Sequence, residues 1–320
     1  MKSTILNEII EKIKVLRENV KRVIIGKDEI IDYMIVALIS KGNVLLEDVP
    51  GVGKTVLAKA LAESIELDFK RIQFTPDTMP SDIIGVNVFN PKTLEFEFKP
   101  GPIFTNILLA DEINRTSPRT QAGLLEAMDE GKVTIDGVLY FLPKPFMVIA
   151  TQNPREHFGT YPLPESQLDR FFISLSIGYL PLEKEVEMLE NQKLYHPLEK
   201  IEPVWKKEDL LKAQDIVKEV YIDRDILKYI VNITDATRKD SNFSLGAGPR
   251  ASIALMRGSQ AFALLDGREY VIPEDVIKMV IPVLVHRIVP AEGDNTTRSR
   301  REELVKDILK KVKIPKVRVL

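Results

Sequence analysis

The chain contains no cysteine in its 320 residues. Disulfides, cysteine-bound iron–sulfur clusters and thiol nucleophiles are therefore excluded. Histidine is scarce, and His157, His196 and His286 lie far apart in the sequence. A zinc site needs a cluster of such ligands, so we expect each histidine to occupy an ordinary surface or hydrogen-bonded position.

Long apolar runs are also missing. No uninterrupted stretch approaches the ~18 residues that would suggest a membrane span. Glu8, Glu11, Lys12 and Lys14 stand where a secretory signal would need apolar residues. The sequence therefore predicts a cytoplasmic protein without membrane insertion.

Net charge of either sign is small, because 45 Lys and Arg nearly offset 47 Asp and Glu to leave −2, with a pI of about 6.1. No global basic field favours nucleic acid or an anionic membrane as a partner, although a local basic patch is compatible with this balance.

Hydrophobic residues make up 44% of the chain, enough for a sizeable core, and the length suggests two principal domains. Residues 3–20 predict an amphipathic helix, because their apolar positions recur near a 3.6-residue period. These positions are Ile5, Leu6, Ile9, Ile10, Ile13, Leu16 and Val20.

Between residues 43 and 181, short apolar runs alternate with helical patterns, which predicts an α/β fold with a parallel sheet covered on both faces. The predicted strands are Val44–Leu46, Ile72–Phe74, Ile107–Ala110, Phe146–Ala150 and Phe171–Ile177.

Two segments in this region predict β-hairpins. In Gly85–Lys99, apolar and charged residues alternate around a turn at Asn90–Thr93. In Lys132–Leu142, Asp136 and Gly137 mark a tight turn.

Helical patterns dominate after Pro181. The predicted helices are Glu183–Gln192, Asp209–Val220, Asp223–Lys239, Pro249–Leu265 and Pro273–Val289. The sequence thus predicts an N-terminal helix (1–20), an α/β core (21–181), a helical lid (182–290) and a charged C-terminal segment (291–320) that the pattern leaves unassigned.

The sharpest motif follows the first predicted strand and precedes a helical pattern, the context of a phosphate-binding P-loop. It runs Pro50, Gly51, Val52, Gly53, Lys54, Thr55 and Val56. Its glycines let the backbone N–H groups face one point, at which the next helix aims its positive N-terminus. Lys54 is expected to reach the β- and γ-phosphates of ATP, and Thr55 to offer its hydroxyl to Mg²⁺.

One position departs from the usual P-loop pattern, which has glycine five residues before Gly53, where this chain has Asp48. Pro50 and Gly51 still supply a turn. The alternative, a glycine-rich turn with a surface lysine, is disfavoured by the strand and helix on either side.

Two acids follow the predicted strand Ile107–Ala110. Asp111 is expected to bind Mg²⁺ through water, and Glu112 to orient the attacking water or accept its proton. A lone pair of acids is more often a solvated strand end, but the P-loop upstream favours the functional interpretation.

Three further residues complete the candidate site. Asn153 follows a predicted strand and could orient water or contact the γ-phosphate, although Asn-Pro is also an ordinary turn. Arg170 and Arg250 carry guanidinium groups suited to the spread charge of a transferring phosphoryl group. On chemistry alone, a structural ion pair is an equally good interpretation of either arginine.

In this order and spacing, the features resemble those of AAA+ ATPases. The strings LLEDVPGVGKT, LLADEINR, QAGLLEAMDE, ATQNP, LPESQLDRF and GAGPRA resemble the MoxR family over roughly residues 20–290, and that family commonly varies at the position of Asp48. The resemblance implies Walker A at Pro50–Thr55, Walker B at Leu108–Glu112, sensor 1 at Asn153, the arginine finger at Arg170 and sensor 2 at Arg250.

The same resemblance implies an αβα core with a five-stranded sheet and an all-helical lid, with the two hairpins as insertions in helix 2 and before sensor 1. It implies that Ile25 and Gly26, in the segment Arg22–Lys27, help to hold adenine. It also implies ATP and Mg²⁺ as cofactors and a homo-oligomeric ring, often a hexamer. Such rings remodel or activate protein clients, often ones with a von Willebrand A domain.

Two other functions share this core. A nucleic-acid motor is disfavoured by the net charge and by Glu95 and Glu97 in the first hairpin, although Lys132 and Lys144 near the second hairpin leave that exclusion incomplete. The motor subunit of a metal chelatase would differ only in its partner.

Overall fold

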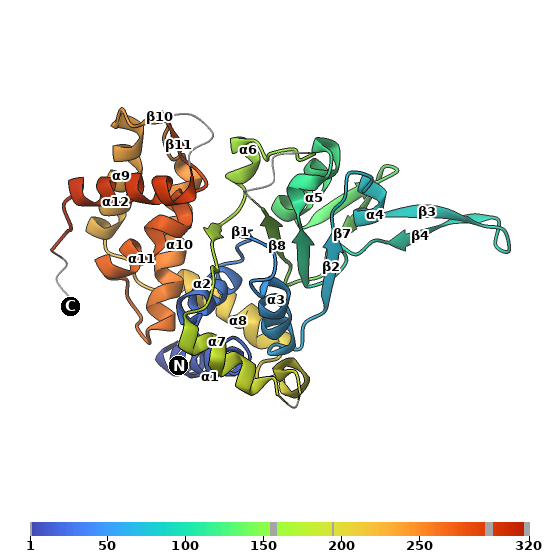
Figure 1. Cartoon of the computed structure of the whole chain (residues 1–320), viewed down its shortest axis with the longest axis horizontal. Helices are drawn as coiled ribbons and strands as arrows, with labels where there is room; N and C mark the ends of the chain where they lie inside the picture. The colour runs from blue at the N-terminus through green and yellow to red at the C-terminus, as the bar shows by residue number, and fades with distance from the viewer. Residues whose placement is uncertain (1, 154–158, 194, 292–296, 317–320) are drawn as a thin grey trace.

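The computed structural model describes residues 2–153, 159–193, 195–291 and 297–316, which leaves His157 and the proline of ATQNP, Pro154, outside the described residues. A five-stranded sheet in the order β2-β5-β8-β1-β9 lies at its centre, and every neighbouring pair is parallel (Figure 1). The strands are β1 Val44–Glu47, β2 Phe69–Gln73, β5 Ile107–Asp111, β8 Met147–Gln152 and β9 Ile173–Leu175. The predicted fold class is confirmed.

Three predicted strands had limits that were wrong by more than one residue. Strand β8 runs from Met147 to Gln152 and not from Phe146 to Ala150. Strand β2 begins at Phe69, three residues before the predicted start at Ile72, because as an edge strand it carries the charged pair Lys70 and Arg71 that interrupts the apolar pattern. Strand β9 covers only the middle of the predicted Phe171–Ile177.

Apolar side chains alternate between the two faces of the sheet and form one core on each. In β1, Val44 and Leu46 belong to the larger core, whereas Leu45 belongs to the smaller one. Each strand residue therefore faces a layer of helices, as expected for a parallel sheet buried on both sides.

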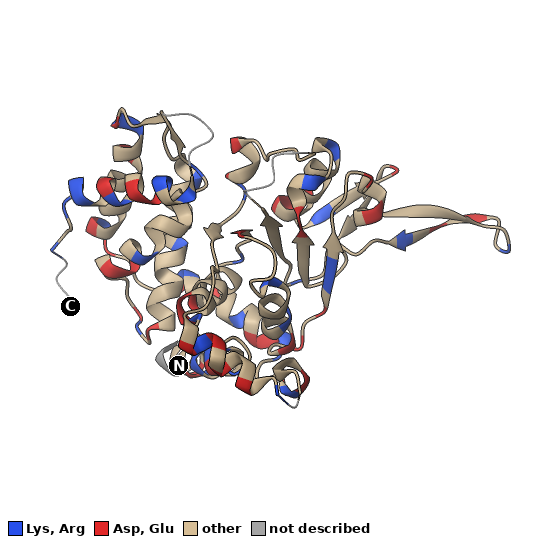
Figure 2. Cartoon of the chain, in the orientation of Figure 1, with Lys and Arg blue, Asp and Glu red and all other residues tan. Residues whose placement is uncertain are grey.

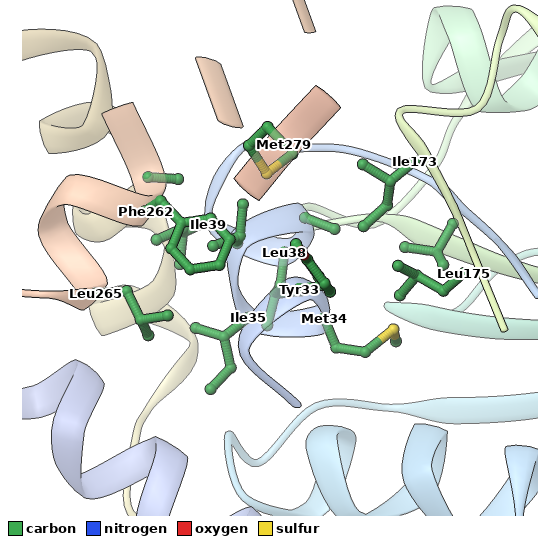
Figure 3. Close-up of a cluster of buried hydrophobic side chains, with 14 of the residues drawn as sticks. Tyr33, Met34, Ile35, Leu38, Ile39, Ile173, Leu175, Phe262, Leu265 and Met279 are labelled. Carbon is green, nitrogen blue, oxygen red and sulfur yellow. The ribbon is translucent and has the colours of Figure 1, made fainter. Parts of the chain in front are cut away.

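The larger core joins the N-terminal helices, the sheet and the lid. Helix α1 (Lys2–Lys21) confirms the predicted amphipathic helix. Helix α2 (Asp28–Ile39) was not singled out from the sequence, and its side chains fill the space between β9 and α10 (Figure 3). Tyr33 packs edge-on against Phe262 of α10 at 5.5 Å between ring centroids. The N-terminal helices therefore pack against both the sheet and the lid, and the predicted domain limits stay predictions.

Both predicted hairpins are present. The first, β3 (Gly85–Asn90) and β4 (Glu95–Pro100), follows the five-residue helix α4 (Pro80–Ile84) and projects away from the body (Figure 1). The second is β6 (Lys132–Ile135) with β7 (Val138–Phe141).

The second hairpin, including its turn residue Asp136, packs against the first hairpin. The rings of Phe98 and Tyr140 lie 4.1 Å apart between centroids, and the Asn87 amide donates to Asp136 at 2.7 Å. Val133 and Ile135 of β6 are buried in the smaller core, so the second hairpin is partly a core element.

The remaining elements cover the sheet or form the helical lid. They are α3 Lys54–Glu63, α5 Pro118–Glu130, α6 Glu165–Leu168, α7 Leu182–Asn191, α8 Lys207–Ile216, α9 Arg224–Lys239, β10 Phe243–Leu245, α10 Pro249–Leu265, α11 Pro273–Leu284, β11 Val289–Pro290 and α12 Arg298–Lys311, with short 3-10 turns at Ile113–Arg115, Pro197–Lys200 and Val217–Glu219. The predicted helix Asp209–Val220 ends as a 3-10 turn, and the predicted Pro273–Val289 ends early at Leu284.

Helix α11 contains Pro282, which has no N–H to donate to the carbonyl of Lys278. The Tyr33 hydroxyl of α2 donates to that carbonyl at 2.9 Å instead. The contact ties the lid to the N-terminal helices. Within the described residues, none of the helices combines the length and apolarity needed to cross a bilayer.

The lid closes on the sheet through His286 and Arg287, which are both buried. The Arg287 guanidinium donates to the carboxylate of Asp169 at 2.9 Å and to the carbonyl of Phe172 at 3.1 Å. One ring nitrogen of His286 lies 3.1 Å from the carbonyl oxygen of Phe171. Burial lowers the pKa of Arg287 to about 10, although Asp169 opposes that effect.

Burial also lowers the pKa of His286 well below 6.5, helped by the charge of Arg287 and opposed by the Phe171 hydrogen bond. As pH falls, His286 is therefore protonated in the unfolded chain before it is protonated in the folded protein. Its contribution to the free energy of unfolding is fully present above about pH 6.5 and is lost below that pH, by up to ~1.4 kcal/mol per pH unit. His286→Gln keeps a donor for Phe171, and we expect it to flatten the pH dependence of the unfolding free energy in urea below that pH. Equal slopes for both proteins would contradict this role.

Candidate functional site

The segment from Asp48 to Lys54 forms a tight loop between β1 and α3. Gly51 and Gly53 have φ of 86° and 91°, in the left-handed region, and a β-carbon on either would meet no atom within 4 Å. Backbone conformation, not space, therefore requires glycine at both positions. Lys54 begins α3, and its ammonium donates to the carbonyl of Asp48 at 2.8 Å, across the mouth of the loop.

The charge of Lys54 faces the predicted acids. Burial lowers the pKa of Lys54, and the carboxylates of Asp48, Asp111 and Glu112 oppose that effect. The structure therefore brings the P-loop lysine and the two strand-end acids into one electrostatic environment. A phosphate chain here would meet Lys54 and the N-terminus of α3, whose N-cap residue Gly53 has no side chain to cap the first N–H groups of the helix.

Asp48, the position that departs from the P-loop pattern, faces away from the loop. Its carboxylate accepts hydrogen bonds from the backbone N–H groups of Ile177 and Gly178 and from the Ser176 hydroxyl at 3.3 Å. Lys27 donates to the carbonyls of Ile177 and Tyr179, at 2.5 and 2.9 Å. Asp48 and Lys27 therefore hold the connection between β9 and the lid against the P-loop.

Asp111 ends β5 and is held from two sides. The Thr151 hydroxyl of β8 donates to one carboxylate oxygen at 2.6 Å, and the guanidinium of Arg71 on β2 donates to the other at 2.6 Å. Arg71 also donates to Gln73 at 2.8 Å. The sequence analysis did not single out Arg71 or Thr151, although charge on an otherwise apolar edge strand was a signal for the first.

Glu112 has φ of 59° and ψ of 49°, a left-handed conformation that ends the extended backbone of β5. Its backbone N–H donates to the Thr151 hydroxyl at 2.9 Å. Its carboxylate accepts from the Gln73 amide at 2.6 Å and lies 3.3 Å from the Arg115 guanidinium. One hydroxyl, that of Thr151, therefore contacts both the carboxylate of Asp111 and the backbone of Glu112.

Asn153 follows β8 directly and is 7% exposed. The preceding residue, Gln152, pairs with Glu47 in the parallel register of β8 and β1, so Asn153 lies beside the start of the P-loop. The structure thus brings Asn153 to the same sheet edge as Asp111 and Lys54.

Ile25 and Gly26 lie in the turn after α1. Gly26 has φ of 68°, and a β-carbon there would come within 2.9 Å of the Lys184 side chain and 3.3 Å of Leu180. The turn therefore contacts the first helix of the lid, and both lie next to the linker that Asp48 holds.

Arg170 and Arg250 lie together but away from the P-loop edge. Arg170 donates to Asp129 at 2.7 Å, and Arg250 lies 3.7 Å from the same carboxylate. Arg170 precedes β9, whose first residue, Ile173, pairs with the first residue of β1, whereas the P-loop follows the last residue of β1. The two arginines thus meet near the amino ends of the strands, and the P-loop lies at the carboxyl ends.

The donor set suits Mg²⁺ held jointly with a nucleotide. Among the described residues, no group of three His, Cys, Asp or Glu side chains could bind a metal alone. Thr55 and Asp111 offer hard oxygen donors, and Mg²⁺ is commonly held by one or two such groups with phosphates and water. The remaining ligands would come from nucleotide and water.

Comparison with known proteins agrees with this geometry. Residues 43–173 match the family described as "ATPase family associated with various cellular activities (AAA)", and residues 235–308 match the AAA lid domain. The chain is 52% identical to the uncharacterized protein YeaC of Bacillus subtilis over 298 residues, 93% of each chain.

It is also 40% identical to the chaperone MoxR1 of Mycobacterium tuberculosis over 307 residues, covering 93% of this chain and 81% of the relative. The crystal structure of a provisionally assigned ATPase from Cytophaga hutchinsonii is 37% identical and superposes with a TM-score of 0.88, covering 98% of both chains.

Asp48→Ala leaves the N–H groups of Ile177 and Gly178 without their acceptor, and we expect a loss of about 1–3 kcal/mol in unfolding free energy, measured in urea. Asp48→Asn keeps one acceptor oxygen and should lose less. Asp48→Gly restores the common pattern yet should be no more stable than Asp48→Ala. Wild-type stability of the glycine variant would contradict this role.

Proposed function

This chain belongs to the MoxR family of AAA+ ATPases, and on that premise we propose that it couples ATP hydrolysis to the remodelling or activation of a protein partner. The observation that carries the proposal is a pair of well-exposed phenylalanines on the projecting first hairpin, remote from the ATPase site. Phe89 and Phe96 face one another at 5.5 Å between ring centroids and are 48% and 73% exposed.

The proposed ATPase chemistry assigns one task to each group at the carboxyl edge of the sheet. Lys54 binds the β- and γ-phosphates, with the backbone of Pro50, Gly51, Val52, Gly53 and Val56 around them. Thr55 and Asp111 hold Mg²⁺, Glu112 activates water, and Asn153 orients it. Ile25 and Gly26 contact adenine.

Arg71 and Gln73 occupy the carboxylates of Asp111 and Glu112 in this structure. In the proposed mechanism, Asp111 would exchange its contact with Arg71 for Mg²⁺ when the nucleotide binds, because a divalent cation would compete for the same oxygen atoms.

Arg170 and Arg250 are proposed to act on the nucleotide of a neighbouring subunit. Their meeting point at Asp129, near the amino ends of the strands, supports this proposal, since it separates them from their own P-loop. A site completed in this way requires a homo-oligomeric ring, and we propose a hexamer by family resemblance.

We propose a protein client that contains a von Willebrand A domain, by family resemblance, because the aromatic hairpin without net charge suits a protein surface better than nucleic acid. The charges of this hairpin balance, since Lys92 and Lys99 offset Glu95 and Glu97, and over the lid both signs are interspersed (Figure 2). Nucleic-acid grooves instead gather positive charge. We propose a cytoplasmic location without membrane insertion.

The trans role of Arg170 is tested by mixing two inactive variants. Glu112→Gln removes the proposed base but keeps the arginine, and Arg170→Ala keeps the site but should lower turnover by about 10³-fold or more. In mixed rings, some interfaces pair an intact site with an intact arginine, so ATPase activity should partly return.

The matched control mixes Arg170→Ala with the double variant Glu112→Gln/Arg170→Ala, in which no interface has both groups. Recovery in this control, or none in the test mixture although native mass spectrometry shows mixed rings, would reject the trans role of Arg170 and shift it to Arg250. A Lys54→Ala variant, measured alone, should fail to bind nucleotide.

The hairpin assignment is tested in the Glu112→Gln background with ATP, which should hold a client on the ring. Adding Phe89→Ser and Phe96→Ser should reduce recovery of the captured protein from native extract by about tenfold, as expected for exposed aromatic contact residues. Tyr270→Ser, on an exposed lid residue, is the control. Undiminished capture would remove this hairpin from the client surface, and the same phenylalanine changes in the active protein should leave basal ATPase unchanged.

A further inference from the structure

Glu47, the last residue of β1, buries its carboxylate one position before Asp48. One carboxylate oxygen accepts from the Gln152 amide of β8 at 2.7 Å, and the other accepts from the Ser174 hydroxyl of β9 at 2.8 Å. A single side chain therefore links the carboxyl ends of three adjacent strands.

Two arginines of the C-terminal helix α12 reach this carboxylate. Arg298 donates to Glu47 at 2.6 Å, to the Ser174 hydroxyl at 2.7 Å and to the Ser174 carbonyl at 2.9 Å. Arg301 lies 3.4 Å from the other oxygen of Glu47. Burial raises the pKa of the Glu47 carboxyl, but Arg301, Arg298, Ser174 and Gln152 together outweigh it and leave the pKa below 4.5.

A buried ion pair of this kind is weak evidence for stability alone, because well-packed apolar side chains often serve as well. What this pair determines is position. Glu47 adjoins Asp48, whose carbonyl holds Lys54, and Gln152 adjoins Asn153. The carboxylate that α12 holds is therefore linked to Lys54 through the adjoining Asp48, and to Asn153 through its hydrogen-bond partner Gln152.

We propose that Arg298 is a positioning residue for ATP hydrolysis, acting through Glu47 to fix the start of the P-loop and the end of β8. Docking of α12 and alignment of the catalytic groups then occur together, so that loss of one weakens the other. A lid displaced by a neighbouring subunit or a client would withdraw Arg298 and slow turnover without touching nucleotide.

Arg298→Ala leaves the buried Glu47 with its neutral partners Gln152 and Ser174, and its remaining cationic contact is the longer one to Arg301. We expect kcat to fall about tenfold, with KM for ATP changed by less than about threefold, because the glycine-bearing loop and the Asp48 contacts remain. Adding Glu47→Gln removes the uncompensated charge. The kcat of the double variant should therefore be about threefold or more above that of Arg298→Ala, which is half of the tenfold loss on a logarithmic scale.

The pH dependence separates positioning from general support of the fold. Without Arg298, the pKa of the buried Glu47 should rise, and protonation should relieve the uncompensated charge. The kcat of Arg298→Ala relative to wild type should therefore rise as pH is lowered from about 8 to about 6. In the Glu47→Gln/Arg298→Ala protein, the same ratio should stay flat.

Arg300→Ala is the matched control, since Arg300 lies in the same turn of α12 and pairs with Glu303 at the surface. It should leave kcat unchanged. Arg298→Lys is the milder variant in case Arg298→Ala does not fold, and it should lose about threefold in kcat because one ammonium cannot make all three contacts.

Three outcomes would overturn the proposal. They are a folded Arg298→Ala with wild-type kcat, a loss that Glu47→Gln does not reduce and that is constant with pH, and full activity of Arg298→Lys when Arg298→Ala cannot be prepared. Far-UV circular dichroism and the unfolding midpoint of each variant establish that the proteins compared are folded.

Discussion

Parallel hydrogen bonding among β1, β8 and β5 determines where the groups proposed to face the phosphates lie. Parallel strands end at a common edge, and here Leu45, Ala150 and Ala110 stand in adjacent positions of a buried ladder. The P-loop, Asn153 and the two acids follow those strands within a few residues. Their mutual spacing is thus set by backbone pairing, and side chains such as Thr151 only refine it.

The joints between core and lid are polar, whereas the interiors on either side are apolar. Asp48, Glu47 and Asp169 each accept hydrogen bonds at a joint, and each lies at the end of a strand or next to one. Directional contacts of this kind fix orientation more closely than apolar packing does, because their strength depends on angle as well as distance. Through Asp48 and Glu47, the lid and its linker are thereby tied to residues adjoining the P-loop.

The sequence predicted the sheet, both hairpins and most lid helices, because apolar periodicity reports which face of an element is buried. The comparisons support the family that the motif strings suggested. Helix α12 was left unassigned because its charged face dominates its sequence, and burial of Leu304, Val305 and Ile308 appears only once the lid is assembled. Arg71 and Arg298 were likewise missed, since the acids that they contact, Asp111 and Glu47, are far away from them in the chain.

Side chains that follow the core in sequence hydrogen-bond to backbone carbonyl groups in and just before β9, and this matters for any shortened form of the protein. In the described sheet, β9 is a terminal strand, and it pairs with β1 on one side. Side chains of His286, Arg287 and Arg298 take up carbonyl oxygens of Phe171, Phe172 and Ser174. A chain cut after β9 would uncover these acceptors at an open sheet edge, where another molecule's strand can add. Aggregation of such a fragment would indicate that the edge is exposed. The lid therefore also protects the sheet from self-association.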